Sequence, residues 1–289
     1  FSSRRRHTRY ISVTGVQTCA LPIFGRTIVL TYKYGHVKMT ETKIGLGVIT
    51  CNRPVFLSRV LETIPFNRID DVVIIDDGTQ GAADPIPPHR NLTYLKNEKN
   101  IGVGKSKNRA VLNLLSRGCE HIFLIEDDII IKNSNVFDEY IKASKDSGIK
   151  HLMFGYHGPA NKKDKKPNPR CVVEYKNTKV AFNPNCVGGF CYYSRDLLMR
   201  IGLFDETFVN AWEHVEHSYR AVLNGYLPAY WWWPDIANSC DYLDELACSE
   251  NDSTIRPRAD WKKNIVEGAK YFRLDRKSTR LNSSHTDIS

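Results

Sequence analysis

Three consecutive carboxylates, Glu126, Asp127 and Asp128, follow an apolar run in the stretch EHIFLIEDDIII (residues 120–131). Burying one unpaired carboxylate is costly, and three adjacent ones repel each other, so a positive partner is expected close by. A divalent cation, shared between a carboxylate and the oxygens of a phosphorylated substrate, would supply that charge. The alternative is a turn at a strand end in which the three acids are simply solvated.

A second pair of acids and a glycine loop add to this pattern. Asp76 and Asp77 end the apolar run DDVVIIDDG (70–78), and the segment NIGVGKSKN follows at residues 100–108. Glycine lets the backbone approach a ligand closely, although a single GxG can also serve only to turn the chain. Each feature is weak alone, so their order along the chain matters more than any one of them.

The segment WEHVEHSYRAVLNG (212–225) predicts a helix that ends at Gly225. Glu216 and Arg220 are four residues apart and are expected to pair. His214 and His217 are three apart and could both contact a metal, but HVEH lacks the spacing of the HExxH metalloprotease motif. We expect His217 to be a neutral residue of the helix face.

Alternating strands and helices are predicted to position these residues. Apolar, β-branched runs predict buried strands at the ranges 43–50, 70–78, 91–97 and 120–131. Helices are predicted between them at 52–64 and 102–118. This alternation favours an α/β fold with a mostly parallel sheet. Ligands bind at the carboxyl ends of strands in such sheets, which is where both acid clusters lie.

The second half of the chain has a mixed pattern. We expect a strand at 151–157, a solvated loop at 161–170, a hairpin at 171–183, a helix at 194–202, an aromatic strand at 226–236 and an amphipathic helix at 258–272.

The two ends of the chain do not resemble parts of a fold. Residues 13–23 and 275–285 can be encoded by codons that are reverse complements at all eleven positions. The implied DNA resembles a sequencing adapter, so we expect residues 1–23 and 275–289 to be translated contamination outside the fold. The natural chain is then expected to begin at Met39 and to end at Leu274 or beyond. Residues 24–38 stay unassigned.

Residues 39–274 are long enough for one domain, with a nucleotide-binding half (39–133) and an acceptor half (134–274). They hold 31 Lys and Arg and 30 Asp and Glu, a net charge of +1 that predicts no nucleic-acid partner. The cysteines have irregular spacing and no CxxC pair, which argues against zinc and favours a reducing cytoplasm. No apolar run approaches the roughly 20 residues of a membrane-spanning helix.

Seven short motifs occur in a fixed order: TCNRP (50–54), DDGTQ (76–80), NIGVGKSKN (100–108), EDD (126–128), GGFCYYSR (188–195), GLFDE (202–206) and EHVEHSYR (213–220). Their order and spacing resemble those of the family 2 glycosyltransferases over about residues 43–235. The resemblance implies a GT-A fold, in which a Rossmann-like, mostly parallel sheet is flanked by helices and followed by a mixed acceptor half.

The resemblance also implies roles on the donor side. Asp77 would face the nucleobase, with Asp76 beside it. Glu126 or Asp127 would contact the ribose, and Asp128 would bind a divalent cation, Mn²⁺ or Mg²⁺. The residues expected to bind the donor nucleotide are Thr50, Asn52, Arg53, Asp76, Asp77, Gly102, Lys105, Asn108, Glu126 and Asp127.

On the acceptor side the family usually has Glu-Asp where this chain has Glu213-His214. Glu213 is the expected general base and His214 is the alternative. Gly188 and Gly189 would let an acceptor approach the backbone, with Trp212 beside it.

These roles imply an inverting, metal-dependent hexosyltransferase that moves a sugar from a nucleotide-sugar, a UDP-sugar, to a hydroxyl group. The acceptor would be a saccharide or lipid-linked saccharide in surface polysaccharide or glycoconjugate synthesis. The enzyme would be cytoplasmic, with at most peripheral association at the inner face of the membrane. One alternative is an inactive nucleotide-sugar-binding relative, which His214 favours. The other is a sugar-nucleotide pyrophosphorylase, whose longer glycine- and arginine-rich loop TCNRP lacks.

Overall fold

The computed structural model describes residues 17–23, 26–32, 42–80, 86, 88–228, 232–247 and 253–284, with only the backbone described for 17–23, 26–32 and 275–284. The chain divides into two compact units, 1–41 and 42–289. In the first unit, β1 (Gln17–Ile23) and β2 (Arg26–Tyr32) form an antiparallel hairpin. The expectation that both chain ends lie outside the fold stays a prediction. All further elements belong to the second unit.

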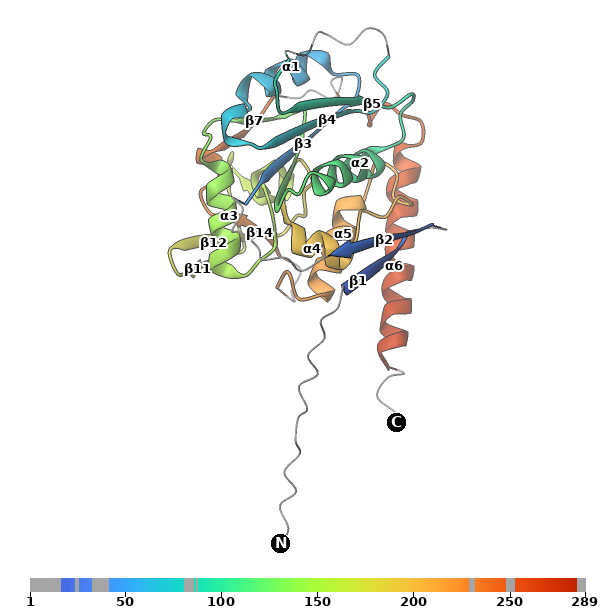
Figure 1. Ribbon diagram of the computed structural model, residues 1–289. Helices are drawn as coiled ribbons and strands as arrows, with labels where there is room; N and C mark the ends of the chain where they lie inside the picture. The colour runs from blue at the N-terminus through green and yellow to red at the C-terminus, as the bar shows by residue number, and fades with distance from the viewer. Residues whose placement is uncertain are drawn as a thin grey trace. The chain divides into compact units, whose positions relative to one another are not determined.

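Six strands form the central sheet, in the order β5-β4-β3-β6-β13-β8. Figure 1 labels the first three of them, β5, β4 and β3. Strands β3, β4, β5 and β6 are parallel, whereas β13 runs antiparallel to its neighbours β6 and β8. A parallel sheet is covered on both faces, which explains the uninterrupted apolar runs in its strands. The predicted α/β class is therefore confirmed. The bounds are β3 (Ile44–Thr50), β4 (Asp71–Asp76), β5 (Leu92–Lys96), β6 (His121–Glu126), β8 (His151–Met153) and β13 (Phe190–Ser194).

Helices α1 (Pro54–Thr63) and α2 (Val103–Ser116) cover opposite faces of this sheet. Gly47 of β3 faces α2, and a Cβ there would lie only 2.9 Å from the Cβ of Ala110. Side chains alternate along a strand, so Thr50 points to the other face, where it lines a cavity with residues of α1. Proline at the start of α1 fixes the backbone for its first turn.

The ends of two further helices follow from the local sequence. Ser194 caps α4 by accepting a hydrogen bond of 3.2 Å from the backbone N–H of Leu197. Gly148 ends α3 with φ 80, a left-handed conformation that glycine adopts easily. The bounds are η1 (Phe66–Arg68), α3 (Val136–Ser147), η2 (Gly155–His157), η3 (Pro159–Asn161), α4 (Arg195–Ile201), α5 (Glu213–Leu223), η4 (Ser239–Asp241) and α6 (Trp261–Ser284).

Small antiparallel sheets complete the second half. The order β11-β12-β14 forms a three-stranded sheet, β7 pairs with β15, and β9 pairs with β10. The predicted hairpin at 171–183 is confirmed, with Lys176 at φ 51 in its turn. The bounds are β7 (Ile129–Ile131), β9 (Lys162–Lys163), β10 (Lys166–Pro167), β11 (Cys171–Tyr175), β12 (Thr178–Asn183), β14 (Trp233–Ile236) and β15 (Leu243–Glu245).

Some predicted elements are corrected by the structure. The strand expected over 120–131 is broken after Glu126 by a turn at Asp127 and Asp128, and β7 pairs with β15 instead of the central sheet. The strand expected over 151–157 ends at Met153 and gives way to η2. The loop expected at 161–170 contains the two short strands β9 and β10. The aromatic strand expected from 226 begins, within the described residues, at Trp233.

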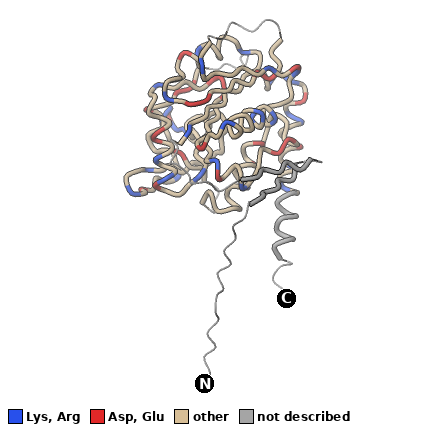
Figure 2. The backbone as a smooth tube through the Cα atoms, in the orientation of Figure 1, with Lys and Arg blue, Asp and Glu red and all other residues tan. Residues whose placement is uncertain are grey.

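Basic and acidic residues are interspersed along the described part of the second unit (Figure 2), in keeping with the net charge of +1 for residues 39–274. Of the helices described, none is both long and apolar enough to cross a membrane.

Candidate active site

The acid cluster lies at the carboxyl end of β6, where the parallel strands end. Thr50 donates a hydrogen bond of 2.6 Å to Asp127 Oδ2, and Arg53 Nη1 lies 2.6 Å from Asp127 Oδ1 and 3.3 Å from Asp128 Oδ2. The Arg53 guanidinium stacks 4.1 Å from the centre of the Phe56 ring, which fixes its position. The protein therefore supplies part of the expected positive charge itself. The fully solvated turn is ruled out, because Asp127 is 4 % exposed.

Asp128 has the properties of a cation ligand. Its Oδ1 is buried and has no hydrogen-bond partner. Burial and then the Glu126 carboxylate raise the pKa of Asp128, although His157 and Arg53 oppose the shift. Burial likewise raises the pKa of Asp127 to about 7, against Arg53 and Thr50. A divalent cation prefers carboxylate oxygens and would stabilise the charged form of Asp128. The described residues contain no group of three or more metal-binding side chains, so substrate or water oxygens would have to complete such a site.

Asp77 holds the glycine loop in place. Its Oδ1 accepts hydrogen bonds from Asn97 Nδ2 at 2.9 Å and from the N–H of Ile101 at 2.8 Å. Its Oδ2 accepts from Asn100 Nδ2 at 2.9 Å and from the N–H of Gly102 at 3.0 Å. Each oxygen thus already has two donors, which leaves Asp77 little capacity for a ligand. Gly102 itself adopts φ 97 at the start of α2, a conformation that favours glycine.

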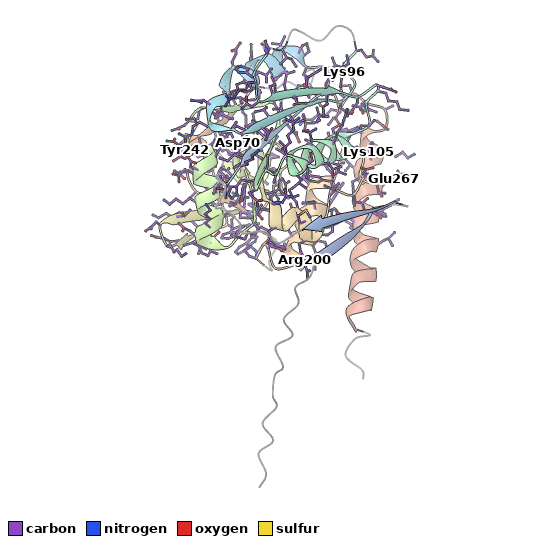
Figure 3. All side chains as sticks on the ribbon, viewed as in Figure 1. Asp70, Lys96, Lys105, Arg200, Tyr242 and Glu267 are labelled. Carbon is purple, nitrogen blue, oxygen red and sulfur yellow. The ribbon has the colours of Figure 1, made fainter. Side chains whose placement is uncertain are left out.

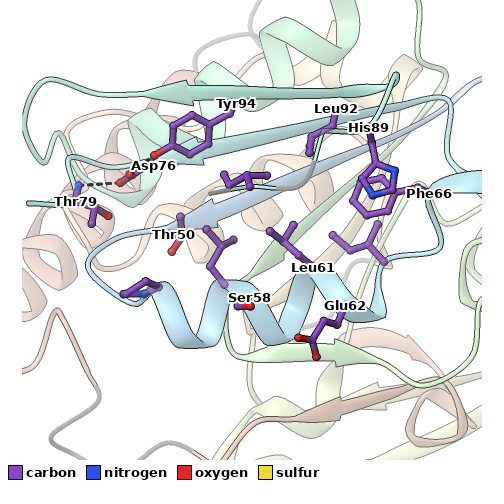
Figure 4. A pocket seen from close by; sticks show the side chains of 14 residues that line it. Thr50, Ser58, Leu61, Glu62, Phe66, Asp76, Thr79, His89, Leu92 and Tyr94 are labelled. Atoms are coloured by element: carbon purple, nitrogen blue, oxygen red, sulfur yellow. Dashed lines mark hydrogen bonds between the residues drawn. The ribbon is translucent and has the colours of Figure 1, made fainter. Parts of the chain in front are cut away.

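Asp76 instead faces a cavity of about 400 Å³ between α1 and the sheet (Figure 4). It accepts hydrogen bonds from the N–H of Thr79, at 2.8 Å, and from the Tyr94 hydroxyl. Figure 4 shows these groups with Thr50 at one end of the cavity, whereas Phe66 and His89 stack at the other. Polar groups at one end and apolar ones beyond suit a planar, partly polar ligand.

Asn52 supports the turn after β4. Its N–H donates to Thr79 Oγ1 at 2.8 Å and its Oδ1 accepts from the N–H of Gln80 at 2.8 Å. Its φ of 54 is left-handed, which asparagine tolerates better than most residues. Asn52 therefore joins the TCNRP and DDGTQ motifs.

A buried lysine links the acid cluster to α5. Lys107 Nζ lies 2.8 Å from Glu126 Oε1, 3.3 Å from Glu213 Oε1 and 3.3 Å from the carbonyl oxygen of Gly188. The Lys107 and Glu213 side chains are 2 % and 5 % exposed. Burial alone would lower the pKa of Lys107, but Glu126 and Glu213 outweigh it and raise that pKa well above its usual range. Lys107 was not among the residues predicted from the sequence.

Glu213 and His214 lie together at the start of α5. His214 Nδ1 is 3.2 Å from Glu213 Oε1. Burial alone would raise the pKa of Glu213, but the Lys107 ammonium and then His214 hold it well below its usual range. Its position in the first turn also favours the charged carboxylate, because the helix dipole is positive there.

The two glycines of GGFCYYSR make room for these side chains. A Cβ on Gly188 would lie 2.9 Å from Lys107 Nζ and 3.2 Å from His214 Cγ. A Cβ on Gly189 would lie 3.1 Å from the His157 ring. A cavity of about 650 Å³ opens beside them, and its lining includes Glu126, Asp128, Gly188, Gly189, Glu213 and His214.

Three predicted site residues lie elsewhere. Lys105 is exposed on α2 (Figure 3), two residues before the buried Lys107. Asn108 is buried but bonds to the backbone of Phe204, at 2.9 Å to its carbonyl oxygen and 2.8 Å to its N–H. Trp212 packs against α6, donating from Nε1 to the carbonyl oxygen of Ile265 at 3.0 Å. Asn108 therefore connects α2 to the segment around Phe204, and Trp212 connects the start of α5 to α6.

Two of the remaining helix predictions agree with the structure. Arg220 pairs with Glu216 and also donates to backbone carbonyls of Ile201 and Leu203. His217 is buried and lies 3.0 Å from the carbonyl oxygen of Gly202. Burial holds the pKa of His217 well below its usual range, so it is neutral.

Two further groups near the cavities were missed. His157 lies 2.9 Å from Glu245 Oε1 beside the acid cluster, and both line the larger cavity. Arg258 reaches Asn100 Oδ1 at 3.1 Å across the glycine loop. Neither belongs to a recognisable motif, and both come from segments distant in sequence, so only the fold brings them to the site.

Comparison with known proteins is consistent with a glycosyltransferase fold. No family model matches the chain. An uncharacterized glycosyltransferase of Acanthamoeba polyphaga mimivirus is 24 % identical over 196 residues, which is 65 % of this chain and 72 % of that protein. Among solved structures, GalNAc-T7 with UDP, GalNAc and Mn²⁺ superposes with a TM-score of 0.55 at 12 % identity, over 82 % of this chain and 49 % of that one.

Residues 1–349 of S. aureus TarS, in complex with UDP-GlcNAc, superpose with a TM-score of 0.52 at 16 % identity. That match covers 77 % of this chain and 64 % of TarS 1–349, so the chain spans about half to two thirds of these two structures. The chain has the GT-A fold, and the predicted fold class is confirmed.

Proposed function

We propose that this protein transfers a sugar from a nucleotide-sugar, a UDP-sugar, to a hydroxyl acceptor. One observation carries the proposal: a single cavity of about 650 Å³ is lined by Asp128, the candidate cation ligand, and by the Glu213–His214 pair. Cation, sugar and proton acceptor are the parts that glycosyl transfer needs within reach of each other. The mimivirus glycosyltransferase and the GT-A fold support the same reaction class.

On the donor side, we propose that Asp76 and its neighbours Thr79 and Tyr94 face the nucleobase while Asp77 holds the loop around it. The donor ribose would lie near Asp127 and Glu126. Asp128 would hold Mn²⁺ or Mg²⁺. A bound cation would offset the negative charge that develops on the leaving diphosphate.

On the acceptor side, a saccharide would lie in the cavity of about 650 Å³, beside Gly188, Gly189 and α5. Attack by its hydroxyl on the face of the sugar opposite the diphosphate inverts the anomeric carbon. A base from the Glu213–His214 pair removes the hydroxyl proton. We propose a hexosyl donor and a saccharide or lipid-linked saccharide acceptor, in surface polysaccharide or glycoconjugate synthesis, with the enzyme in the cytoplasm and at most peripherally bound to the membrane.

The first test is calorimetric titration of the full chain with UDP, with and without Mn²⁺. UDP is expected to bind at least tenfold more tightly with Mn²⁺, and Asp128→Asn should remove that gain. Asp138→Asn is the control, because Asp138 forms an exposed surface pair with Arg68. If Mn²⁺ does not change the UDP affinity of wild type, Asp128→Asn or Asp138→Asn, the cation role of Asp128 is contradicted.

The second test follows turnover of a panel of UDP- and GDP-sugars by release of the nucleoside diphosphate. A transferase releases the nucleoside diphosphate, slowly when water is the acceptor and faster when a hydroxyl acceptor is present. A pyrophosphorylase would instead release pyrophosphate from UTP and a sugar phosphate. A binding-only relative would bind UDP and release nothing from any donor.

A further inference from the structure

The Glu213–His214 contact fixes which imidazole nitrogen carries the hydrogen. Glu213 Oε1 is 3.3 Å from the Lys107 ammonium and 3.2 Å from His214 Nδ1, and both Glu213 and Lys107 are buried. A buried carboxylate beside a buried ammonium stays ionised, and an ionised carboxylate can only accept hydrogen bonds. His214 Nδ1 must therefore be the donor. In the neutral ring this leaves Nε2 with its lone pair free to accept a proton.

The two side chains differ in their access to a substrate. The His214 side chain is 25 % exposed and lines the larger cavity, whereas the Glu213 side chain is 5 % exposed. Two donors, Lys107 Nζ and His214 Nδ1, already lie close to Glu213 Oε1. Its pKa, held well below the usual range by Lys107, makes the carboxylate a weak base. Glu213 is thus better suited to orient a base than to be one.

We propose that His214 is the general base of the transferase and that Glu213 and Lys107 are positioning residues that fix its tautomer. This inference rests on the proposed function. The acceptor hydroxyl gives its proton to Nε2 while its oxygen forms a bond to the anomeric carbon of the donor. The bond from that carbon to the diphosphate oxygen breaks, and its electron pair leaves with the diphosphate. The imidazolium that forms is stabilised by Glu213, as in other carboxylate–histidine pairs.

Substitution at His214 tests the proton transfer. His214→Asn keeps an N–H that can reach Glu213 but has no basic nitrogen. With a donor that the wild type turns over, kcat for diphosphate release should fall by about 10²- to 10⁴-fold, while the UDP affinity in Mn²⁺ stays unchanged. Imidazole should partly restore His214→Ala. The proposal is overturned if His214→Asn keeps kcat within threefold of wild type, or if formate restores Glu213→Ala while imidazole does not restore His214→Ala.

The tautomer can be measured whether or not a donor is found. Side-chain ¹H–¹⁵N NMR of the full chain should show that the neutral His214 ring carries its hydrogen on Nδ1. Glu213→Gln should change that tautomer population, and Lys142→Met, an exposed lysine of α3, should not. A ring that carries its hydrogen on Nε2 in the wild type would refute the inference. Failure of the proposed function would show itself separately, as absence of UDP binding and of any donor turnover.

Discussion

Replacing Lys107 by methionine should destabilise the fold strongly, because it leaves a buried carboxylate without its counterion. The Glu213 side chain is 5 % exposed and loses an ammonium at 3.3 Å, whereas the Glu126 side chain is 31 % exposed and can be solvated instead. Breaking a buried ion pair by removing one partner costs about 3–5 kcal/mol. His214 and the start of α5 still stabilise the Glu213 charge, so we expect the lower end, about 3 kcal/mol.

The assay is urea unfolding of wild type and Lys107→Met between pH 5 and pH 8. In the wild type the pKa of Glu213 is depressed, so its contribution to stability is present above the unfolded value of 4.5 and is lost as the pH falls through the folded value. In Lys107→Met, Lys107 no longer opposes the effect of burial, so the pKa of Glu213 should rise. Protonation of Glu213 at lower pH should then remove the cost of burying its unpaired charge. The difference in unfolding free energy should therefore be largest near pH 8 and shrink towards pH 5.

Two results would refute this reasoning. One is a difference in unfolding free energy between wild type and Lys107→Met below about 1 kcal/mol at pH 7, which is the contribution expected of a solvent-exposed ion pair. The other is a difference that does not change with pH. The double variant Lys107→Met/Glu213→Gln provides the control. It removes both charges, so it should recover part of the loss, and Lys142→Met on the exposed face of α3 should change nothing.

Three further predictions follow from single contacts. Gly188→Ala should lower kcat about tenfold or more, because its Cβ would lie 2.9 Å from Lys107 Nζ and 3.2 Å from His214 Cγ and would shift both; it should destabilise the fold less than Lys107→Met, because the lysine charge remains. Unchanged kinetics would contradict this. Burial raises the pKa of Asp235 to about 7, so its contribution to stability should fall as the pH rises from about 4 to 7; urea unfolding of Asp235→Asn should show a smaller decrease than wild type over that range, the remainder coming from groups such as Asp127. Trp212→Phe should cost about 1 kcal/mol of unfolding free energy through the lost bond to Ile265, measured in urea, and no loss would argue against that bond.

The sheet and the cluster of acids at its strand ends could be predicted, because the hydrophobic pattern determines where the strands stop. Buried parallel strands give apolar runs, and the acids at 76–77 and 126–128 lie where those runs stop. The break after Glu126 was harder to foresee, because IIIK resumes the apolar pattern at once. Only β15, from more than 100 residues later, reveals that Ile129–Ile131 belongs to another sheet.

Roles within a motif were less predictable than the motif itself. Adjacent residues of a strand end point to opposite faces, so Asp76 and Asp77 cannot serve the same ligand equally. Asp76 points towards α1 and the cavity, and Asp77 towards the glycine loop. The sequence DDG contains no information on which of its two carboxylates faces which cavity. Among the described residues, Asp76 lines the cavity of about 400 Å³ beside α1, whereas Asp77 lines a smaller one, of about 60 Å³, with Asn100 and Asp127.

The helical periodicity of α2 could have predicted that Lys107 is buried and Lys105 is not. The buried positions of α2 include Gly104, Lys107, Val111 and Leu114, which recur at intervals of three and four residues. Lys107 therefore lies on the stripe set by the apolar residues, and Lys105 lies off it. A lysine on the core-facing stripe of a helix demands buried carboxylate partners. Their identity, Glu126 and Glu213, needed the fold, because neither is within 15 residues of Lys107 in the chain.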